Sequence, residues 1–400
     1  LNASGAIATG VIGTAFSSIG RIEDTGGSPV YLDGQLDEVR IYNQVLTDAE
    51  VIAIRDIIRP CAIAFSHVRI EHSGLGLTCE PAPVTVKACA DAGCTPLYLD
   101  SVTTTLSPTG WVGGDTISFT GSTLANLRRT TPGTVTLGAG TTSPAPASAT
   151  LCFNGLSQTC ELEFNDSGFI FSAIPTQIAG TTSAAQTLRA VRKSDSSDAC
   201  VGLFNGNVNI DLASQCVNPA TCQGGQQVTV DNNGATAIAA NPGSGVTTWT
   251  TKSMTFGANS TASFTMNYPD VGAIRLSARH NIDNSGDYMT GASNDFVVRP
   301  AGFVVSNIQR TADGVANPGA ADAAGAVFIK AGESITLTAT AVNAQGNATP
   351  NYGREIAPEG VRLTTALAPG LGLSNNPALD NGIIPGGLFS AGSATVSNVT

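Results

Sequence analysis

Few side chains in this sequence could carry acid–base or metal chemistry near neutral pH, because the chain of 400 residues holds only three histidines. His67 and His72 are five positions apart in a segment that alternates like a strand, and an odd separation on a strand directs two side chains to opposite faces. A shared metal ion is therefore not expected. His67, Arg69 and Glu71 do share a face, and they are candidates for a surface-binding cluster. A solvated cross-strand charge pair would give the same pattern and is favoured.

A second polar segment has the spacing of the start of a calcium loop. Asp283, Ser285 and Asp287 alternate as the first EF-hand ligands do. However, Tyr288 stands where such a loop needs glycine, and Asn294 stands where it needs a bidentate glutamate. The segment is better interpreted as a polar hairpin turn, and we expect neither a metal nor a cofactor.

Paired carboxylates occur at Asp33 and Asp37 and again at Glu161 and Glu163. Glycoside hydrolysis needs two carboxyl groups that face each other across a cleft, one of them with a raised pKa, and neighbours on one strand do not supply this arrangement. The sequence also lacks G-x-S-x-G, G-x-x-x-x-G-K-[ST], G-x-G-x-x-G and H-E-x-x-H motifs. We therefore expect a protein that is not an enzyme.

The two tryptophans, Trp111 and Trp249, leave two interpretations open. An exposed indole ring suits the flat face of a sugar, which makes both residues candidates for surface binding. Their alternating neighbours favour the other interpretation, in which each ring anchors a hydrophobic core.

The nine cysteines are interpreted as structural, because none lies in a C-x-x-C pair and their surroundings are polar and uncharged. Three pairs each bracket a short loop that contains turn residues, and these pairs are the disulfide candidates: Cys89 with Cys94, Cys152 with Cys160, and Cys216 with Cys222. Cys61, Cys79 and Cys200 are left unassigned. Disulfides of this kind indicate an oxidising, extracellular compartment.

Composition narrows the class of protein further. Charged residues make up 12% of the chain, and 30 acidic against 19 basic residues give a net charge of −11, which has the wrong sign for binding nucleic acid. No run of about 18 strongly apolar residues marks a transmembrane segment. The chain has no signal peptide and stops within a strand-like pattern, so we expect it to be a fragment of a longer protein.

The pattern of elements is almost entirely β, with alternating segments separated by Gly, Pro, Asn and Asp. A strand is expected over residues 36–42. One short helix is predicted over residues 48–58, since Thr47 and Glu50 form a capping box before an apolar run that Pro60 ends.

The fold predicted from these patterns is a tandem array of Ig-like β-sandwich modules. The expected parts are a segment 1–58, which the resemblance given next assigns to the end of a jelly roll, a Cys-containing module 61–150, a second Cys-containing module 151–222, a third sandwich 223–300 and a truncated fourth module 301–400.

Residues 32–51, LDGQLDEVRIYNQVLTDAEV, resemble the closing strand and short helix of a laminin-G-like, concanavalin A-type jelly roll. The resemblance covers only the last ~50 residues of a module that usually needs ~150–200. It implies that fold and gives no ligand.

The rest of the chain resembles the MshQ-like surface proteins of the mannose-sensitive hemagglutinin (MSHA) type IV pilus system of Gram-negative bacteria. The likeness spans most of residues 61–400. It is carried by HVRIEH at 67–72, GLTC at 76–79, VTVKACAD at 84–91 with Cys94, CVNPATC at 216–222, FVVRP at 296–300, AGES at 331–334 and NYG at 351–353.

The resemblance implies an extracellular component of a pilus or cell surface that binds noncovalently to surfaces, glycans or other pilus proteins. Two alternatives stay open. One is a non-catalytic, carbohydrate-binding region of a secreted enzyme, and the other is a purely structural stalk in pilus biogenesis.

Overall fold

The computed structural model of the chain describes residues 21–23, 29–31, 47, 64–155, 157–282, 287–320, 324–366 and 378–400. The chain divides into two compact units, Leu1–Ala62 and Ile63–Thr400. In the first unit, β1 (Arg21–Glu23) pairs antiparallel with β2 (Pro29–Tyr31). The predicted strand over 36–42 and the predicted helix over 48–58 lie outside the described residues, so the jelly-roll expectation stays a prediction.

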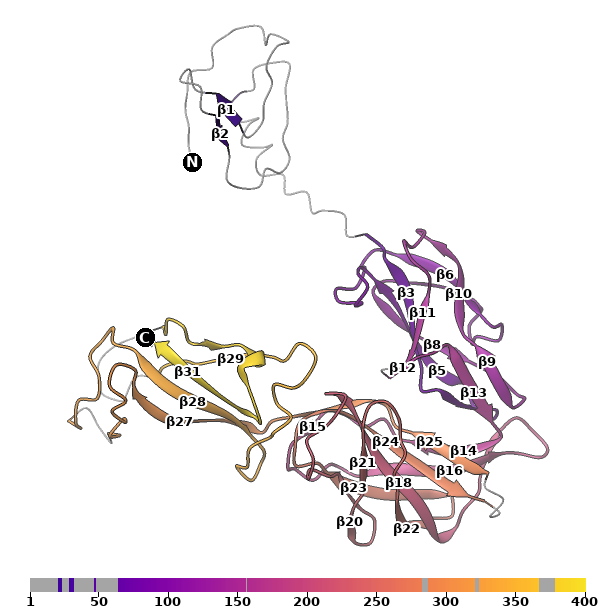
Figure 1. Ribbon diagram of the computed structural model, residues 1–400. Helices are drawn as coiled ribbons and strands as arrows, with labels where there is room; N and C mark the ends of the chain where they lie inside the picture. The colour runs from indigo at the N-terminus through magenta and orange to yellow at the C-terminus, as the bar shows by residue number, and fades with distance from the viewer. Residues whose placement is uncertain are drawn as a thin grey trace. The chain divides into compact units, whose positions relative to one another are not determined.

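Among the residues of the second unit that the structure describes, every regular element is a strand except one short 3-10 turn, η1 (Gly386–Leu388), which confirms the predicted all-β class (Figure 1). No helix among the described residues is long and apolar enough to span a membrane.

The first module of this unit comprises residues 64–165 and forms three small sheets, with the strand orders β12-β11-β3-β5-β8, β10-β6-β7 and β4-β13-β9. Its strands are β3 (His67–Glu71), β4 (Leu75–Leu77), β5 (Ala82–Cys89), β6 (Val102–Ser107), β7 (Thr116–Phe119), β8 (Ser122–Leu127), β9 (Gly133–Thr136), β10 (Gly138–Ser143), β11 (Leu151–Asn154), β12 (Ser157–Gln158) and β13 (Glu161–Asn165). Because β11 pairs with β3 and β13 pairs with β4, this module continues past the predicted boundary at residue 150.

Alternation builds the core of the first module, as expected from the sequence. Val68 and Ile70 on β3 and Val84 and Val86 on β5 are fully buried, while Arg69 and the intervening positions face outward. Inward apolar side chains pack on one another, and the outward face of the five-stranded sheet is left for polar groups.

The second module comprises residues 166–300, and its strands join one hydrogen-bonded network of 13 strands. These strands are β14 (Ser167–Phe171), β15 (Gln177–Ile178), β16 (Gln186–Lys193), β17 (Cys200–Gly202), β18 (Gly206–Asn218), β19 (Thr229–Asp231), β20 (Ala235–Ala237), β21 (Ala239–Asn241), β22 (Thr250–Phe256), β23 (Thr261–Asn267), β24 (Gly272–Asn281), β25 (Tyr288–Ala292) and β26 (Phe296–Arg299). Strand β18 pairs with β22 and β24. The predicted modules 151–222 and 223–300 therefore share one sheet rather than forming two.

The third module comprises residues 301–400 and contains β27 (Gly302–Arg310), β28 (Ile335–Val342), β29 (Val361–Arg362), β30 (Ile383–Ile384) and β31 (Ser393–Val399). Three of its rings contact one another edge to face at centroid distances of 4.8–6.3 Å: Tyr352 and Phe389 are buried, and Phe303 is exposed beside them.

Four disulfides reinforce these small cores. The three predicted local pairs are bonded: Cys89–Cys94, Cys152–Cys160 and Cys216–Cys222. A fourth bridge joins Cys79 in the first module to Cys200 in the second, across 121 positions of sequence. Cys61 lies outside the described residues.

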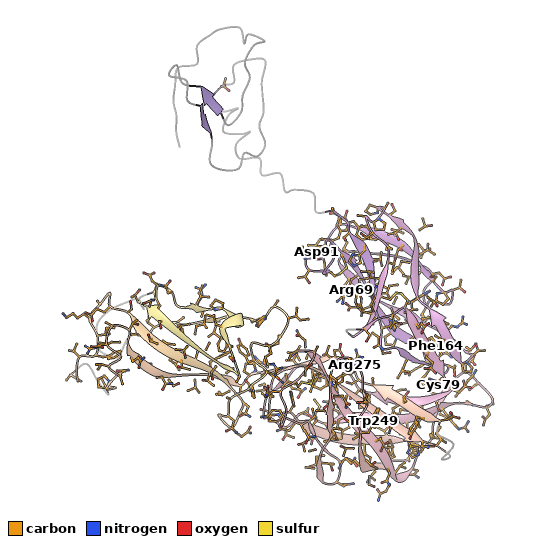
Figure 2. The ribbon with its side chains drawn as sticks, viewed as in Figure 1. Arg69, Cys79, Asp91, Phe164, Trp249 and Arg275 are labelled. Atoms are coloured by element: carbon orange, nitrogen blue, oxygen red, sulfur yellow. A yellow bond between two sulfur atoms is a disulfide. The ribbon has the colours of Figure 1, made fainter. Side chains whose placement is uncertain are left out.

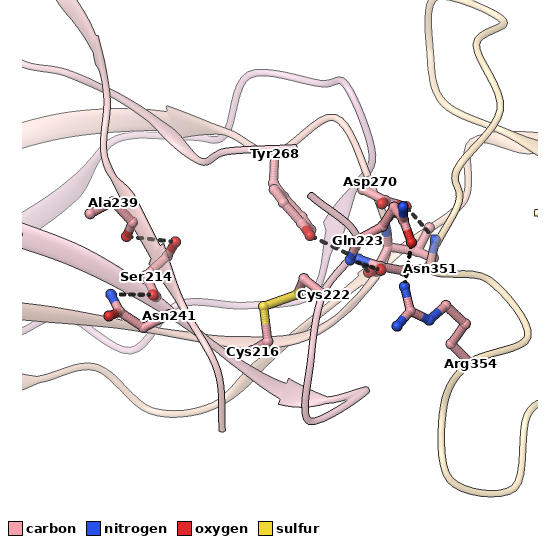
Figure 3. The surroundings of a disulfide bond; sticks show 11 residues. Ser214, Cys216, Cys222, Gln223, Ala239, Asn241, Tyr268, Asp270, Asn351 and Arg354 are labelled. Atoms are coloured by element: carbon pink, nitrogen blue, oxygen red, sulfur yellow. Dashed lines mark hydrogen bonds between the residues drawn. A yellow bond between two sulfur atoms is a disulfide. The ribbon is translucent and has the colours of Figure 1, made fainter. Parts of the chain in front are cut away.

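The second and third modules meet at a polar junction near the Cys216–Cys222 bridge (Figure 3). Asn351 of the third module donates to Tyr268 Oη (3.0 Å) and to the Val271 carbonyl (3.2 Å), and its backbone N–H donates to Asp270 Oδ1 (3.1 Å). In the opposite direction, the Gln223 backbone N–H donates a hydrogen bond of 2.7 Å to Asn351 Oδ1. Asn351 is fully buried, so this network fixes one module against the next.

Candidate ligand-binding cleft

A cleft with a volume of about 650 Å³ opens between the first and second modules. Its walls are the outward face of the sheet β12-β11-β3-β5-β8 and a surface formed by β14, β24, β25 and the segment 293–295. The volume falls within the range of roughly 300–1,000 Å³ that is typical of sites for small ligands.

The wall from the first module carries a cross-strand charge cluster. Arg69 pairs with Glu71 (Nε–Oε1 2.9 Å), and Lys87, which lies opposite Arg69 on β5, reaches the same carboxylate at 2.8 Å. The Arg69 guanidinium also stacks on the ring of Phe153 at 4.1 Å from its centroid. Stacking and pairing together hold the planar group flat on the sheet, and the exposed side chain of Leu124 on β8 lines the same cleft.

The opposite wall carries a second fixed charge pair. Arg275 on β24 donates from Nε to Asp295 Oδ1 at 2.6 Å and from Nη1 to Asn154 Oδ1 of the first module at 3.0 Å. The Arg275 side chain is only 12% exposed, so its orientation is set by these two partners. Figure 2 labels Arg69 and Arg275, and both line the cleft from their separate modules.

His72 is an uncharged member of the cleft lining. Its Nδ1 accepts from the Gly74 N–H at 3.1 Å, so Nε2 carries the proton that it donates to the Thr159 carbonyl at 2.9 Å. Burial lowers the pKa of His72, and the nearby Arg275 adds to the effect, whereas the bond to Thr159 opposes it. The ring is therefore neutral at pH 7.

The Cys79–Cys200 bridge lies beside the cleft and ties its two walls together (Figure 2 labels Cys79). Around it, Thr78 donates to Asp166 Oδ1 at 2.5 Å, and Arg128 donates to the Asp198 carbonyl at 2.9 Å. These contacts cross between the modules, so the cleft is formed before any ligand arrives.

Burial also perturbs an acidic group in the lining. Desolvation raises the pKa of Glu80, and the positive charges of Arg189 and Arg128 oppose that rise.

The surface-binding candidates from the sequence separate into two groups. Arg69 and Glu71 line the cleft, as a pair. His67 is 1% exposed and Trp111 is 5% exposed, with its indole N–H donating to the Pro108 carbonyl, so burial removes both from contact with a ligand. Trp249 is half-buried outside the cleft, and Arg279 covers its ring at 4.5 Å.

The other candidates do not assemble into a catalytic or metal centre. Glu161 and Glu163 are exposed on β13. Asp283, Ser285, Asp33 and Asp37 lie outside the described residues. Among the residues that the structure describes, no group of three or more His, Cys, Asp or Glu side chains is placed to hold a metal ion.

Sequence reasoning missed Arg275 and Asp295. They lie about 200 residues from Arg69 along the chain, and only the pairing of whole modules brings them to one cleft. No local pattern marks such a contact.

Three protein-family models match parts of the second unit. Residues 149–292 match a domain of unknown function, DUF6701, in its first Ig-like domain. The second module is thus similar to a DUF6701 Ig-like domain. Residues 299–398 match the second domain of DUF6701, and residues 65–145 match a further domain of unknown function, DUF8613.

Similarity to solved structures is remote. The D0-D1 domain of Intimin is 12% identical, with 58% of this chain and 98% of that chain covered and a TM-score of 0.26. A marsupial T cell receptor is 9% identical, with 69% of this chain and 80% of that chain covered and a TM-score of 0.17. No curated protein matches the chain.

Proposed function

We propose that this chain is part of an adhesin-like protein that a Gram-negative bacterium exports and displays on its surface or on a pilus. The protein binds other surfaces noncovalently and has no catalytic role. The resemblance to MshQ-like proteins supports the pilus setting, and the match to Ig-like domains supports a binding role for the folded modules.

The disulfides support export. All eight cysteines that the structure describes are paired, and stable disulfides form in oxidising compartments such as the periplasm and the cell exterior.

The cleft is the observation that carries the binding role. It presents fixed charged and apolar side chains from two modules that a disulfide joins, and preformed sites lose less entropy when a ligand binds. Displayed in many copies, even weak sites of this kind would give strong attachment through multivalency.

A structural stalk is the second candidate, because specific contacts favour it. His67 and Trp111 are buried, and the Asn351 network interlocks two successive modules. A stalk predicts no ligand for the cleft, whereas an adhesin does, so the same experiment separates the two.

The experiment coats beads with the oxidised full chain and measures their attachment to cells of the native organism and of a host surface. Two variants test the cleft: Leu124→Arg places a charge inside it, and Leu99→Arg makes the same change at an equally exposed leucine that does not line it. We expect attachment by the wild type and by Leu99→Arg, with loss in Leu124→Arg. Beads that attach no better than uncoated beads would overturn the proposal in favour of a stalk.

A further inference from the structure

The side chains that line the cleft limit the class of ligand that can bind there. This inference rests on the proposed binding function. We propose that the outward face of the sheet β12-β11-β3-β5-β8 and the facing wall at Arg275 form a binding site for a neutral saccharide.

Charge balance is the first argument. The charged residues that line the cleft are Arg69 and Arg275 on the positive side and Glu71, Glu80 and Asp295 on the negative side. Four of them form two ion pairs, Lys87 adds a further positive charge at Glu71, and Glu80 is a third carboxylate, on which the charges of Arg189 and Arg128 act. With Lys87 included, three positive side chains (Arg69, Lys87, Arg275) stand against three negative ones (Glu71, Glu80, Asp295), so a charged ligand would find no excess of the opposite sign.

The charge of the whole chain points the same way. A net charge of −11 repels anionic ligands such as sulfated or sialylated glycans at long range. Cationic ligands would need a free carboxylate, but Glu71 and Asp295 are each held by a guanidinium group, and Glu80 lies in the field of Arg189 and Arg128.

The polar groups suit hydroxyls. A sugar hydroxyl both donates and accepts, and it is recognised best where planar donors and acceptors lie side by side in fixed positions. The Arg69–Glu71 and Arg275–Asp295 pairs supply such arrays, and the second is fixed further by Asn154 of the opposite module.

Apolar side chains between these arrays suit the C–H faces of a sugar ring. Leu124 is 63% exposed on the sheet wall, Pro81 and Pro83 are exposed beside it, and Phe171 is half-buried on the opposite wall. The cleft therefore alternates hydrogen-bonding and apolar surface, as sites for small polar ligands do.

The orientation of the sheet argues against an extended peptide as the ligand. A peptide strand binds a sheet through backbone groups at an exposed edge. On the wall formed by β3 and β5 the cleft is lined by side chains from the face of internal strands, although Leu75, Gly76 and Leu77 of the edge strand β4 also contribute to the lining. On that wall the ligand thus meets side chains rather than a free backbone edge.

The test applies the fluorescently labelled full chain to an array of neutral, sialylated and sulfated oligosaccharides. We expect binding to a subset of the neutral ones. Leu124→Arg should weaken that binding by roughly tenfold or more, and Leu99→Arg should leave it within about twofold.

A second variant tests charge balance directly. Glu71→Gln leaves Arg69 and Lys87 without their carboxylate, so binding should shift from neutral towards sulfated saccharides. Asp313→Asn is the matched control, because it breaks a similar exposed pair with Arg310 in the third module and should shift nothing.

The outcomes separate this inference from the proposed function. Beads could attach to cells through the cleft while no neutral saccharide binds the chain or inhibits that attachment. This result would overturn the saccharide inference and indicate a protein ligand, while the adhesin-like role would stand. If Glu71→Gln and Asp313→Asn give the same array pattern, the charge-balance argument fails.

Discussion

At the scale of single residues, a carboxyl group is buried at the junction of the second and third modules. Asp270 is fully buried, and its Oδ1 accepts the N–H groups of Val271 (2.8 Å) and Asn351 (3.1 Å). No described residue donates to its Oδ2. Burial raises the pKa of Asp270 to about 6, with Glu355 adding to the rise and Arg354 and the two N–H bonds opposing it.

This raised pKa predicts an unusual dependence of stability on pH. Because the folded carboxyl binds its proton more tightly than the unfolded one, its contribution to stability is complete below the ordinary value of 3.8 and is lost as the pH rises through about 6. The loss is on the order of 3 kcal/mol. Urea unfolding of the wild type and Asp270→Asn at pH 4 and pH 7 measures it: the wild type should lose stability relative to the variant as the pH rises.

The control for this experiment is Asp313→Asn, which alters an exposed aspartate in the third module. Its unfolding free energy should run parallel to that of the wild type at both pH values. Equal pH dependence in the wild type and Asp270→Asn would contradict the assignment of the raised pKa to Asp270.

A close approach of backbone to a core ring gives a second prediction at this scale. A Cβ atom at Gly76 would lie 2.7 Å from the ring of Phe164, which is fully buried (Figure 2 labels Phe164). Gly76→Ala should therefore destabilise the protein by roughly 1–3 kcal/mol. Gly302→Ala, in a strand with open space around the site, should be close to neutral when both are compared by thermal unfolding.

At the scale of elements, the disulfides act on different lengths of chain. The Cys79–Cys200 bridge closes 121 positions and joins two modules, whereas Cys89–Cys94 closes 5 within one hairpin. In the chain-entropy picture, the long bridge contributes about 5 kcal/mol and the short one about 2 kcal/mol.

Paired substitutions test this difference. Cys79→Ala with Cys200→Ala should lower stability more than Cys89→Ala with Cys94→Ala, and it should also weaken attachment, since the cleft loses the tie between its walls. Calorimetry and the bead assay on the full chain measure both effects. A smaller stability loss for the long bridge, with attachment unchanged, would contradict this role.

The buried positions of individual strands and the short-range disulfides could be predicted from the sequence. In the sequences of β22 and β23 the large apolar residues stand at every second position, and all four, Met254, Phe256, Phe264 and Met266, are buried, as period-2 alternation predicts. The three local disulfides were readable because each pair brackets a short turn.

Long-range pairing was not readable from local patterns. The cross-module bridge of Cys79 joins residues 121 positions apart, and β18 pairs with β24 across a loop that resembles a module boundary. In the same way, His67 lies at an outward-facing position of its strand but is covered by packing from elsewhere in the module. Such contacts depend on how sheets pack, and period-2 patterns carry no information about that.

At the scale of the whole molecule, the chain is a series of modules that disulfides stabilise, which favours an oxidising compartment outside the cytoplasm. Intact mass measurement on the native protein tests this state. Reduction should add a pair of hydrogen atoms for each of the four bridges. Native protein in which these cysteines all react with a thiol reagent before reduction would contradict an oxidising compartment.

The central claim is that this protein is displayed on the cell surface, where its cleft can meet a ligand. Immunogold electron microscopy of intact, unpermeabilised cells of the native organism, with antibody raised against the full chain, tests it most directly. The account predicts gold label on the outer surface or along pili. Label that appears only inside permeabilised cells, with none on intact ones, would contradict it.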